Sequence, residues 1–309
     1  MKLPGLKKDV ALAPYTTFGI GGKARYFFPA KNKEDIVSAL QFGKKARLPV
    51  FILGGGSNLL VSDRGFNGLV IKMDNKRYEA RSQNVYAEAG VLMSRLVNLT
   101  VKRGLKGFEW AGGLPGTLGG AIRGNAGAFG GETKDSVMSV QCIDGAGKTR
   151  ELSARECGFS YRSSVFKRKN WIVVSAQLKF SKGNPADLRK TAQGCVKYRE
   201  DRHPLNFGNA GSIFKNCDLK EIPPALLDFV KPVVKRDPFP VVPVAFLISE
   251  AGLKGSCQGD AQVSEKHPNF IVNKGHATSK DVMRLIKKVK KVVMKRFHVP
   301  LEMEVQCLK

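Results

Sequence analysis

Two glycine-rich runs contain the residues that most directly suggest a chemical role. The first is Gly54-Gly55-Gly56-Ser57-Asn58, and the second fills residues 112–131, where nine of twenty residues are glycine. Consecutive glycines can turn several backbone N–H groups toward one point and so form an anion nest suited to a pyrophosphate. A tight turn explains the first run equally well, so this run by itself leaves both alternatives open.

The first run does not match the common nucleotide-binding patterns. It lacks the Lys-Ser or Lys-Thr ending of the Walker motif, and it leads into a second apolar stretch, Leu59–Val61, where the dinucleotide fingerprint requires a helix. A phosphate site at this run therefore needs a fold of another kind.

Three isolated polar residues offer acid or ion-pairing chemistry, and each also has an ordinary structural explanation. Ser212 follows Gly211, and a serine hydroxyl is a weak acid that must be held close to the group it protonates. Arg162 carries a guanidinium fork that suits a carboxylate better than an ammonium does. His267 stands alone, and a lone histidine is more often structural than functional. These three residues do not indicate a functional site until other motifs of the sequence connect them.

The end of the chain alternates apolar and polar residues, which predicts a strand. The apolar members are Leu301, Met303, Val305 and Cys307, and the polar members are Glu302, Glu304 and Gln306. Both glutamates fall on the same face of such a strand, so alternation cannot select one of them.

Short strands and one helix are predicted to position the first glycine run. Strands are expected at 25–29, Val50–Leu53 and 69–72, and a helix at Lys33–Lys45 that Asn32 and Asp35 open. After the second run, residues 137–143, 148–152 and 171–180 are expected to be strands separated by turns. These elements predict a small α/β unit followed by further strands.

The second half of the chain is predicted to contain two long helices. One spans 186–202, and the other follows the capping box Thr278-x-x-Asp281 and places Val282 to Phe297 at helical spacing. The lysines on the outer face of the last helix suit a solvated surface or a nucleic-acid patch, and the absence of interleaved aromatic residues favours the first. A proline-rich stretch, about 220–242, cannot form one regular element, and its role stays open.

Composition excludes a disordered or membrane-spanning chain. The 309 residues are 42% hydrophobic and 25% charged, as expected for a globular protein of about two domains. The apolar run 241–248 is far shorter than the roughly 20 residues that cross a bilayer, and no signal peptide is evident, so a cytoplasmic protein is expected. The net charge of +26 favours anionic partners, either phosphorylated ligands or nucleic acid. Six cysteines without C-x-x-C spacing predict reduced thiols and no metal site.

Six motifs, in order along the chain, resemble the UDP-N-acetylenolpyruvoylglucosamine reductase family, also called UDP-N-acetylmuramate dehydrogenases. Two of the motifs are the glycine runs, of which the second contains Pro115-Gly116-Thr117-Leu118-Gly119-Gly120 and Asn125-Ala126-Gly127. The opening Tyr15–Gly22 is similar to the N-terminal signature of that family. The remaining motifs are residues 158–167, 209–216 and 301–305.

The resemblance implies an α+β architecture with a flavin fold of the vanillyl-alcohol-oxidase (PCMH) type. Residues 1–183 would bind FAD through two α/β subdomains, about 1–73 and 74–183. Residues 184–309 would form a C-terminal α/β substrate domain whose last strand returns to the active site.

The resemblance also implies the reaction. The family reduces UDP-N-acetylglucosamine enolpyruvate to UDP-N-acetylmuramate for peptidoglycan, with FAD as cofactor and NADPH as co-substrate. The chain would act as a monomer in the cytoplasm, without membrane insertion, a specific nucleic-acid partner or a metal.

Site residues carry over from the resemblance position by position. Ser212 would be the proton donor, Arg162 would bind and polarise the substrate carboxylate, and Glu304 would help stabilise the enolic intermediate. The expected FAD-binding residues are Gly54, Gly55, Gly56, Ser57, Asn58, Leu59, Pro115, Gly116, Thr117, Gly119, Gly120 and Asn125. The expected substrate contacts are Tyr161, Arg202, Lys215, Asn216 and His267.

Four positions depart from the family pattern, and two of them, Met303 for a common proline and Pro268 for a common alanine, do not bear on a named contact. Phe129 stands where many members have tyrosine, which removes a hydroxyl that could contact the substrate. Arg202 stands where others have lysine, so a phosphate contact there would be bidentate.

Two alternative functions remain at the level of sequence. Another FAD oxidase or dehydrogenase of the same fold would account for both glycine runs, although it is not expected to share the Gly-Ser-x-Phe-Lys-Asn motif or the terminal glutamates. A basic nucleic-acid-binding protein would account for the charge and leave both glycine runs unexplained.

Overall fold

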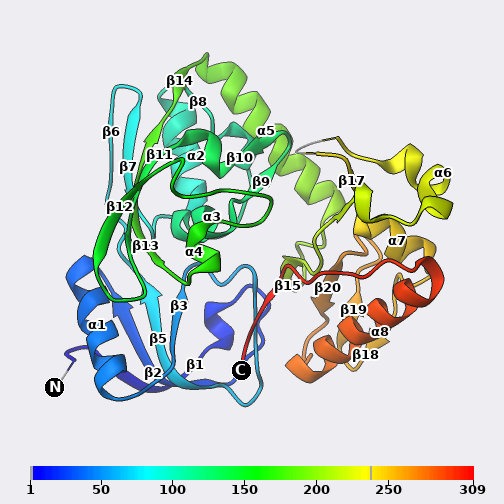
Figure 1. Cartoon of the computed structure of the whole chain (residues 1–309), viewed down its shortest axis with the longest axis horizontal. Coiled ribbons are helices and arrows are strands. Elements are labelled where there is room, and N and C mark those ends of the chain that lie inside the picture. The colour runs from blue at the N-terminus through cyan, green and yellow to red at the C-terminus, as the bar shows by residue number, and fades with distance from the viewer. Residues whose placement is uncertain (1–2, 237–238) are drawn as a thin grey trace. The chain divides into compact units, whose positions relative to one another are not determined.

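The chain divides into two compact units that interleave along the sequence. The computed structural model describes residues 3–236 and 239–309 (Figure 1). The first unit consists of residues up to 10, 24–55 and 67–199, and the second of residues 11–23, 56–66 and 200–309. The boundary expected at residue 183 falls just before α5 (Pro185–Arg202), most of which belongs to the first unit. The assignment of FAD and substrate to separate domains stays a prediction.

A four-stranded sheet opens the first unit. Its order is β1 (Lys7–Ala11), β2 (Lys23–Ala30), β5 (Phe66–Met73) and β3 (Val50–Leu53), and β3 runs parallel to β5. Helix α1 (Lys33–Lys45) covers this sheet and buries Ile36 and Ala39 in the same core as Leu69 (Figure 1). The Asn32 side chain accepts a hydrogen bond from the Asp35 N–H at 2.8 Å, so the predicted helix start is confirmed.

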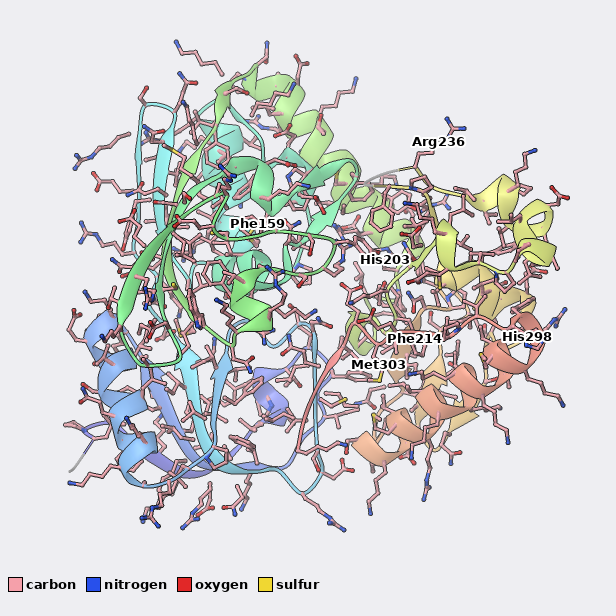
Figure 2. All side chains as sticks on the ribbon, in the orientation of Figure 1. Phe159, His203, Phe214, Arg236, His298 and Met303 are labelled. Atoms are coloured by element: carbon pink, nitrogen blue, oxygen red, sulfur yellow. The ribbon has the colours of Figure 1, made fainter. Side chains whose placement is uncertain are left out.

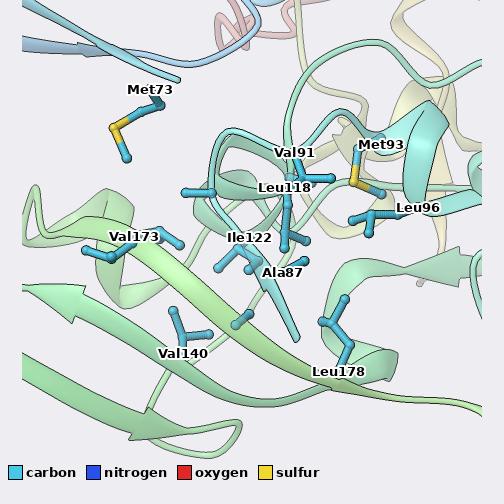
Figure 3. Close-up of a cluster of buried hydrophobic side chains, with 14 of the residues drawn as sticks. Met73, Ala87, Val91, Met93, Leu96, Leu118, Ile122, Val140, Val173 and Leu178 are labelled. Atoms are coloured by element: carbon cyan, nitrogen blue, oxygen red, sulfur yellow. The ribbon is translucent and has the colours of Figure 1, made fainter. Parts of the chain in front are cut away.

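A five-stranded antiparallel sheet forms the rest of this unit. Its order is β12 (Thr149–Ser153), β11 (Val137–Ile143), β13 (Ile172–Lys179), β7 (Asn84–Glu88) and β6 (Tyr78–Arg81), which confirms the strands predicted after the second glycine run. Helices α2 (Met93–Lys102) and α3 (Leu118–Gly124) pack on it, and Figure 3 shows Leu96, Leu118 and Ile122 meeting Ala87 and Leu178. Burial of this apolar cluster fixes the position of the second glycine run, from which α3 begins.

Short elements complete the first unit. They are the pairs β8 (Leu105–Lys106) with β14 (Ser181–Lys182) and β9 (Gly127–Ala128) with β10 (Gly131–Glu132), and helix α4 (Val165–Arg168).

The second unit is built on another antiparallel sheet, ordered β15 (Gly208–Ser212), β20 (Phe270–Asn273), β19 (Ala261–Val263) and β18 (Cys257–Gln258). Helices α7 (Val244–Glu250) and α8 (Ser279–Phe297) pack within it. The predicted capping box is present, because Thr278 accepts from the Asp281 N–H while Asp281 accepts from the Thr278 N–H.

The predicted terminal strand is wrong for residues 301–305. Only β21 (Gln306–Leu308) is a strand, and it pairs in parallel with β4 (Leu59–Val61). The preceding residues divide their hydrogen bonds between two partners, since the Glu304 N–H donates to Ile213 O at 2.8 Å and the Gln306 N–H donates to Asn58 O at 3.1 Å. A segment that changes partner in this way cannot keep the alternation of a regular strand.

The proline-rich stretch contains no long element, as predicted. It holds α6 (Leu227–Val230), three single 3₁₀ turns and β17 (Val241–Val242), which pairs with β16 (Cys217–Asp218). Residues 237 and 238 of this stretch lie outside the described residues. Across 3–236 and 239–309, no helix is long and apolar enough to cross a membrane.

Candidate active site

The two glycine runs meet in the first unit. A Cβ added to Gly55 would lie 2.6 Å from Gly116 Cα, and one added to Gly54 would lie 2.8 Å from Thr117 Oγ1. Side chains at these positions would force the two loops apart, so glycine is required by close backbone approach. Gly116 also has φ +103°, which favours glycine. The structure therefore brings together residues that lie about 60 positions apart in the sequence.

A buried hydroxyl beside this contact has no hydrogen-bond partner. Thr117 is buried, and within the described part of the chain its Oγ1 accepts and donates nothing. An unpaired buried polar group is costly, so such a group often indicates a ligand. A Cβ added to Gly120 would lie 3.8 Å from the same oxygen. The cradle of Gly54, Gly55, Gly116 and Thr117 thus fits the polar groups of a cofactor such as FAD.

Lys72 fixes the entrance of the first run. Its Nζ donates to Gly54 O at 2.7 Å, and burial lowers the pKa of this ammonium from its ordinary value. A charged donor to a backbone carbonyl holds the loop in one conformation.

The rest of the first run belongs to the second unit. Gly56 has φ +64°, and a Cβ there would lie 2.0 Å from Tyr15 O. The Thr17 N–H donates to Gly56 O at 3.2 Å. The N-terminal motif Tyr15–Gly22 therefore supports the loop that precedes Ser57, Asn58 and Leu59, a positioning role that its sequence alone did not reveal.

Two predicted cofactor residues act mainly in packing. A Cβ at Gly119 would lie 2.7 Å from Ala89 Cβ, so this glycine lets α3 approach the chain at Ala89. Asn125 is fully buried in the left-handed region, and its amide donates to Ser160 O at 3.2 Å and accepts from the Lys134 N–H at 3.1 Å. Both residues shape the loop from behind, and Pro115 precedes Gly116 at its edge.

Arg162 occupies a strained turn in the first unit. Ser160 and Ser163 exchange two backbone hydrogen bonds of 3.1 Å, and Arg162 between them has φ +52°. Its Nη2 donates to Gly127 O at 2.9 Å, and its Cζ lies 5.0 Å from the centre of the Tyr161 ring. Backbone strain of this kind is concentrated at functional sites.

Ser212 ends β15 in the second unit at a break in the strand register. Gly211 before it has φ +75°, and the Gly211 N–H donates to Asn209 Oδ1 at 3.0 Å. The Ser212 side chain is half-buried, and its hydroxyl forms no hydrogen bond to any residue of 3–236 or 239–309. The hydroxyl is thus held on an ordered strand end and is available to a ligand.

The segments around Ser212 and Asn58 are joined through Glu304. Glu304 N–H donates to Ile213 O, and Glu304 O accepts from Asn58 Nδ2 at 3.2 Å. A β-bridge links Phe214 to Met303, which lie side by side in Figure 2. The structure therefore brings three predicted site positions, Asn58, Ser212 and Glu304, into one part of the second unit.

The two terminal glutamates differ in their surroundings. Glu302 is exposed and forms an ion pair with Lys215 Nζ, while the Lys215 N–H donates to Glu302 O at 3.0 Å. Glu304 is half-buried. The alternation of the sequence left the choice open, and this difference favours Glu304 as the residue directed to the site.

Two further predicted substrate contacts, Asn216 and Arg202, differ in their surroundings within this chain. Asn216 accepts from the Val244 N–H at 3.2 Å and so helps to start α7. Arg202 is exposed at the end of α5.

His267 is half-buried against aromatic rings. Its ring centre lies 5.4 Å from that of His203 and 4.8 Å from that of Phe270. Burial, with a smaller effect of Lys235, lowers the pKa of His267 to about 4, so the imidazole is neutral at physiological pH. Its Nδ1 is buried and has no hydrogen-bond partner among the described residues. A substrate contact by His267 stays a prediction.

Arg199 is a residue of the first unit that the sequence did not single out. Its Nε donates to Gly112 O at 2.9 Å, and its Cζ lies 5.2 Å from the centre of the Phe129 ring. Phe129, at the position that departs from the family, also packs edge-on against Tyr198. One basic residue in a chain with 52 gives no distinguishing sequence signal. Only the folded structure brings Arg199 to Gly112, so the sequence could not have predicted this contact.

Family models match two parts of the chain. Residues 24–153 match the FAD binding domain, and residues 203–308 match the C-terminal domain of UDP-N-acetylenolpyruvoylglucosamine reductase. The first match confirms the flavin fold that the family resemblance implies.

Whole-chain relatives carry the same name as the second match. The chain is 37% identical to UDP-N-acetylenolpyruvoylglucosamine reductase of Solibacter usitatus, with 99% of each chain covered. It is 41% identical to the reductase of Carboxydothermus hydrogenoformans, over 96% of this chain and 92% of the relative. The crystal structure of the Thermus caldophilus reductase superposes with a TM-score of 0.79 at 30% identity, over 98% of this chain and 100% of the other.

Proposed function

This chain belongs to the UDP-N-acetylenolpyruvoylglucosamine reductase family, and we propose that it reduces UDP-N-acetylglucosamine enolpyruvate to UDP-N-acetylmuramate with Ser212 as the proton donor. It is an FAD-dependent oxidoreductase with NADPH as co-substrate, and its product is a peptidoglycan precursor. The observation that carries the role of Ser212 is its uncommitted, half-buried hydroxyl on a strand end tied to Glu304.

FAD would lie against the glycine cradle. Backbone N–H groups of Gly54 to Asn58 would bind its pyrophosphate, and Thr117 Oγ1 would gain the hydrogen-bond partner that it lacks among the described residues. The cofactor supplies the hydride chemistry that no side chain can perform. Pro115, Gly116, Gly119 and Gly120 would shape the remainder of the cofactor site.

Ser212 would deliver a proton to the substrate carbon next to the one that gains hydride. A serine hydroxyl is a poor acid in water, so the protein must hold it within hydrogen-bond reach of that carbon. The ordered surroundings supply this restraint, because Ile213 N–H donates to Asn269 O at 2.8 Å and Ile213 O accepts from the Glu304 N–H.

Arg162 and Glu304 would act on the charge that develops during reduction. The Arg162 guanidinium would bind the substrate carboxylate, towards which negative charge moves as the enol ether is reduced. The hydrogen bond from Arg162 Nη2 to Gly127 O restrains the guanidinium before the substrate arrives, which lowers the entropy lost on binding. Glu304 would stabilise the enolic form of the substrate, and Tyr161, Arg202, Lys215, Asn216 and His267 would contact other parts of it.

Separate measurement of the two half-reactions tests the role of Ser212. In Ser212→Ala, bleaching of the flavin spectrum by NADPH under anaerobic conditions should proceed at the wild-type rate. Recovery of the spectrum on addition of the enolpyruvyl sugar should slow by about 100-fold or more, as expected for loss of a general acid. Ser256→Ala, in a loop of the same unit, is the matched control and should leave both rates unchanged.

Two results would contradict the proposal. Equal loss of both half-reactions in Ser212→Ala would make Ser212 a structural residue. Bleaching by NADPH without recovery by the sugar in the wild-type protein would reassign the substrate.

A monomer in the cytoplasm is also proposed. All six cysteines are free thiols, four of them buried, which suits a reducing compartment. Light scattering on the FAD-loaded protein checks the monomer, and a mass near 68 kDa, twice that of the 33.8 kDa chain, would contradict it.

A further inference from the structure

The outer face of α8 is strongly basic. It carries Lys280, Arg284, Lys287, Lys288, Lys290, Lys291, Lys295 and Arg296, and all eight side chains are exposed. From Arg284 to the end of the helix there is no acidic residue. Figure 2 shows nitrogen-tipped side chains extending away from the helix that ends at the labelled His298. The proposed reaction uses none of these residues.

The opposite face of α8 fixes this surface in place. Val282, Leu285, Ile286, Val289, Val293 and Phe297 are buried in the core of the second unit. The helix has 19 residues, and at a rise of 1.5 Å per residue it is about 28 Å long. The positive charges are therefore arranged along a straight, rigid stripe, which we call the α8 basic face.

Apolar side chains are exposed on the α8 basic face and on α6, which packs against the end of α8. Met294 follows Lys290 and Lys291 by one turn and is 47% exposed. On α6, Leu227 and Phe229 are exposed as well, and the Phe229 ring stacks 6.0 Å from that of Phe297 at the end of α8. Exposed apolar groups among lysines are typical of surfaces that meet a lipid interface.

We propose that the α8 basic face binds the surface of an anionic phospholipid bilayer without inserting a helix. Lysines near such a surface are attracted by the negative headgroups, and the exposed Met294 among them could enter the boundary between headgroups and acyl chains. A single-stranded nucleic acid would satisfy the charges, yet it needs aromatic side chains for stacking, and α8 itself exposes none, while the ring of Phe229 on α6 is stacked on the buried Phe297. The exposed apolar side chain of Met294 therefore favours the bilayer over a nucleic acid as the anionic partner.

Cosedimentation with vesicles tests this surface. The FAD-loaded protein should bind sucrose-loaded vesicles of phosphatidylcholine and phosphatidylglycerol at a ratio of three to one, and should not bind phosphatidylcholine alone. Each basic residue near such a surface contributes about fivefold to partitioning, so the variant K287Q/K288Q/K291Q/K295Q should bind at least about 50-fold more weakly. Binding should also be lost in 1 M salt, where the Debye length falls to about 3 Å.

A matched control separates the α8 basic face from the net charge of the chain. K7Q/K8Q/K44Q/K190Q removes the same charge from exposed lysines of the first unit and should bind vesicles within about twofold of wild type, because the local potential falls off within a Debye length. Equal losses in the two quadruple variants would overturn the proposal. Neither variant should change the rate of either half-reaction, which shows that the folded enzyme is retained.

Met294→Gln distinguishes a bilayer from a nucleic acid. The substitution keeps the helix and the charges, so it should weaken vesicle binding about three- to tenfold and leave binding to polyuridylate unchanged. Tight binding to polyuridylate with no vesicle binding would overturn the proposal. Vesicle binding that Met294→Gln does not alter would also overturn it, because the apolar contact would then be absent.

Discussion

Around Gly55 in the first unit the candidate site depends on close backbone packing, and around Ser212 in the second unit it depends on single side chains. Around Gly55, the loop approaches Gly116 so closely that no Cβ fits, and its backbone N–H groups are the proposed ligands of FAD. Around Ser212, single side chains matter, and the Glu304 segment, which comes from the other end of the unit, joins Ile213 to Asn58. The comparison teaches that the two halves should tolerate mutation differently.

Gly55→Ala should have the largest effect. Overpacking at a contact of 2.6 Å with Gly116 Cα costs about 1–3 kcal/mol, so the affinity for FAD should fall about 10- to 100-fold. Titration of the apoprotein with FAD, followed by flavin fluorescence, measures this change. Gly124→Ala is the control, because among the described residues beyond its own helix and its chain neighbours no atom lies within 4 Å of a Cβ built there, so FAD affinity should be unchanged. Equal affinities of the two variants for FAD would show that the close backbone contact at Gly55 does not shape the FAD site.

The stability of the second unit should depend on pH through His267. Its pKa is lowered to about 4 in the folded protein, so the unfolded chain takes up the proton first as the pH falls. The contribution of neutral His267 is complete above about pH 6.5 and is lost between about pH 6.5 and pH 4. The free energy of unfolding should therefore be about 2 kcal/mol lower at pH 5.0 than at pH 7.5 from this residue alone.

Urea unfolding of variants isolates that contribution. His267→Phe should reduce the difference between pH 7.5 and pH 5.0 by about 2 kcal/mol, whereas His276→Gln, at an exposed histidine, should keep it. An unchanged pH dependence in His267→Phe would show that His267 becomes charged without penalty in the folded protein.

Gly211→Ala should have the smallest effect and would sharpen the contrast with Gly55. Gly211 has φ +75°, but within 3–236 and 239–309 no atom apart from its own and its chain neighbours' lies within 4 Å of a Cβ built there, so backbone strain is what opposes the substitution. The free energy of unfolding should fall by about 1–2 kcal/mol, and FAD affinity should stay at its wild-type value. Gly194→Ala, within α5 and equally open, should be neutral or slightly stabilising. A loss of FAD affinity in Gly211→Ala would show that the backbone around Ser212 also shapes the cofactor site.

Local patterns were sufficient for the regular elements of the fold. The helix at Lys33–Lys45 and the capping box of α8 were predicted correctly, because hydrophobic periodicity and capping act within a few residues. The strand at the terminus was predicted too long, because the pattern does not show that the Glu304 segment bonds to both Ile213 and Asn58. Both hydrogen-bond partners of this segment are distant from it in the sequence, so a local pattern cannot predict them.

The sequence by itself determined which residue types stand at the candidate site and that the glycines of both runs serve the backbone. Glycine and capping signals are readable because they reflect conformations of single residues. Only the tertiary structure decided that Gly55 faces Gly116, that Thr117 Oγ1 is left unpaired among the described residues, and that Glu302 pairs with Lys215 while Glu304 does not take that partner. These are contacts between residues far apart in the chain, and burial of the apolar cores, not local preference, brings them together.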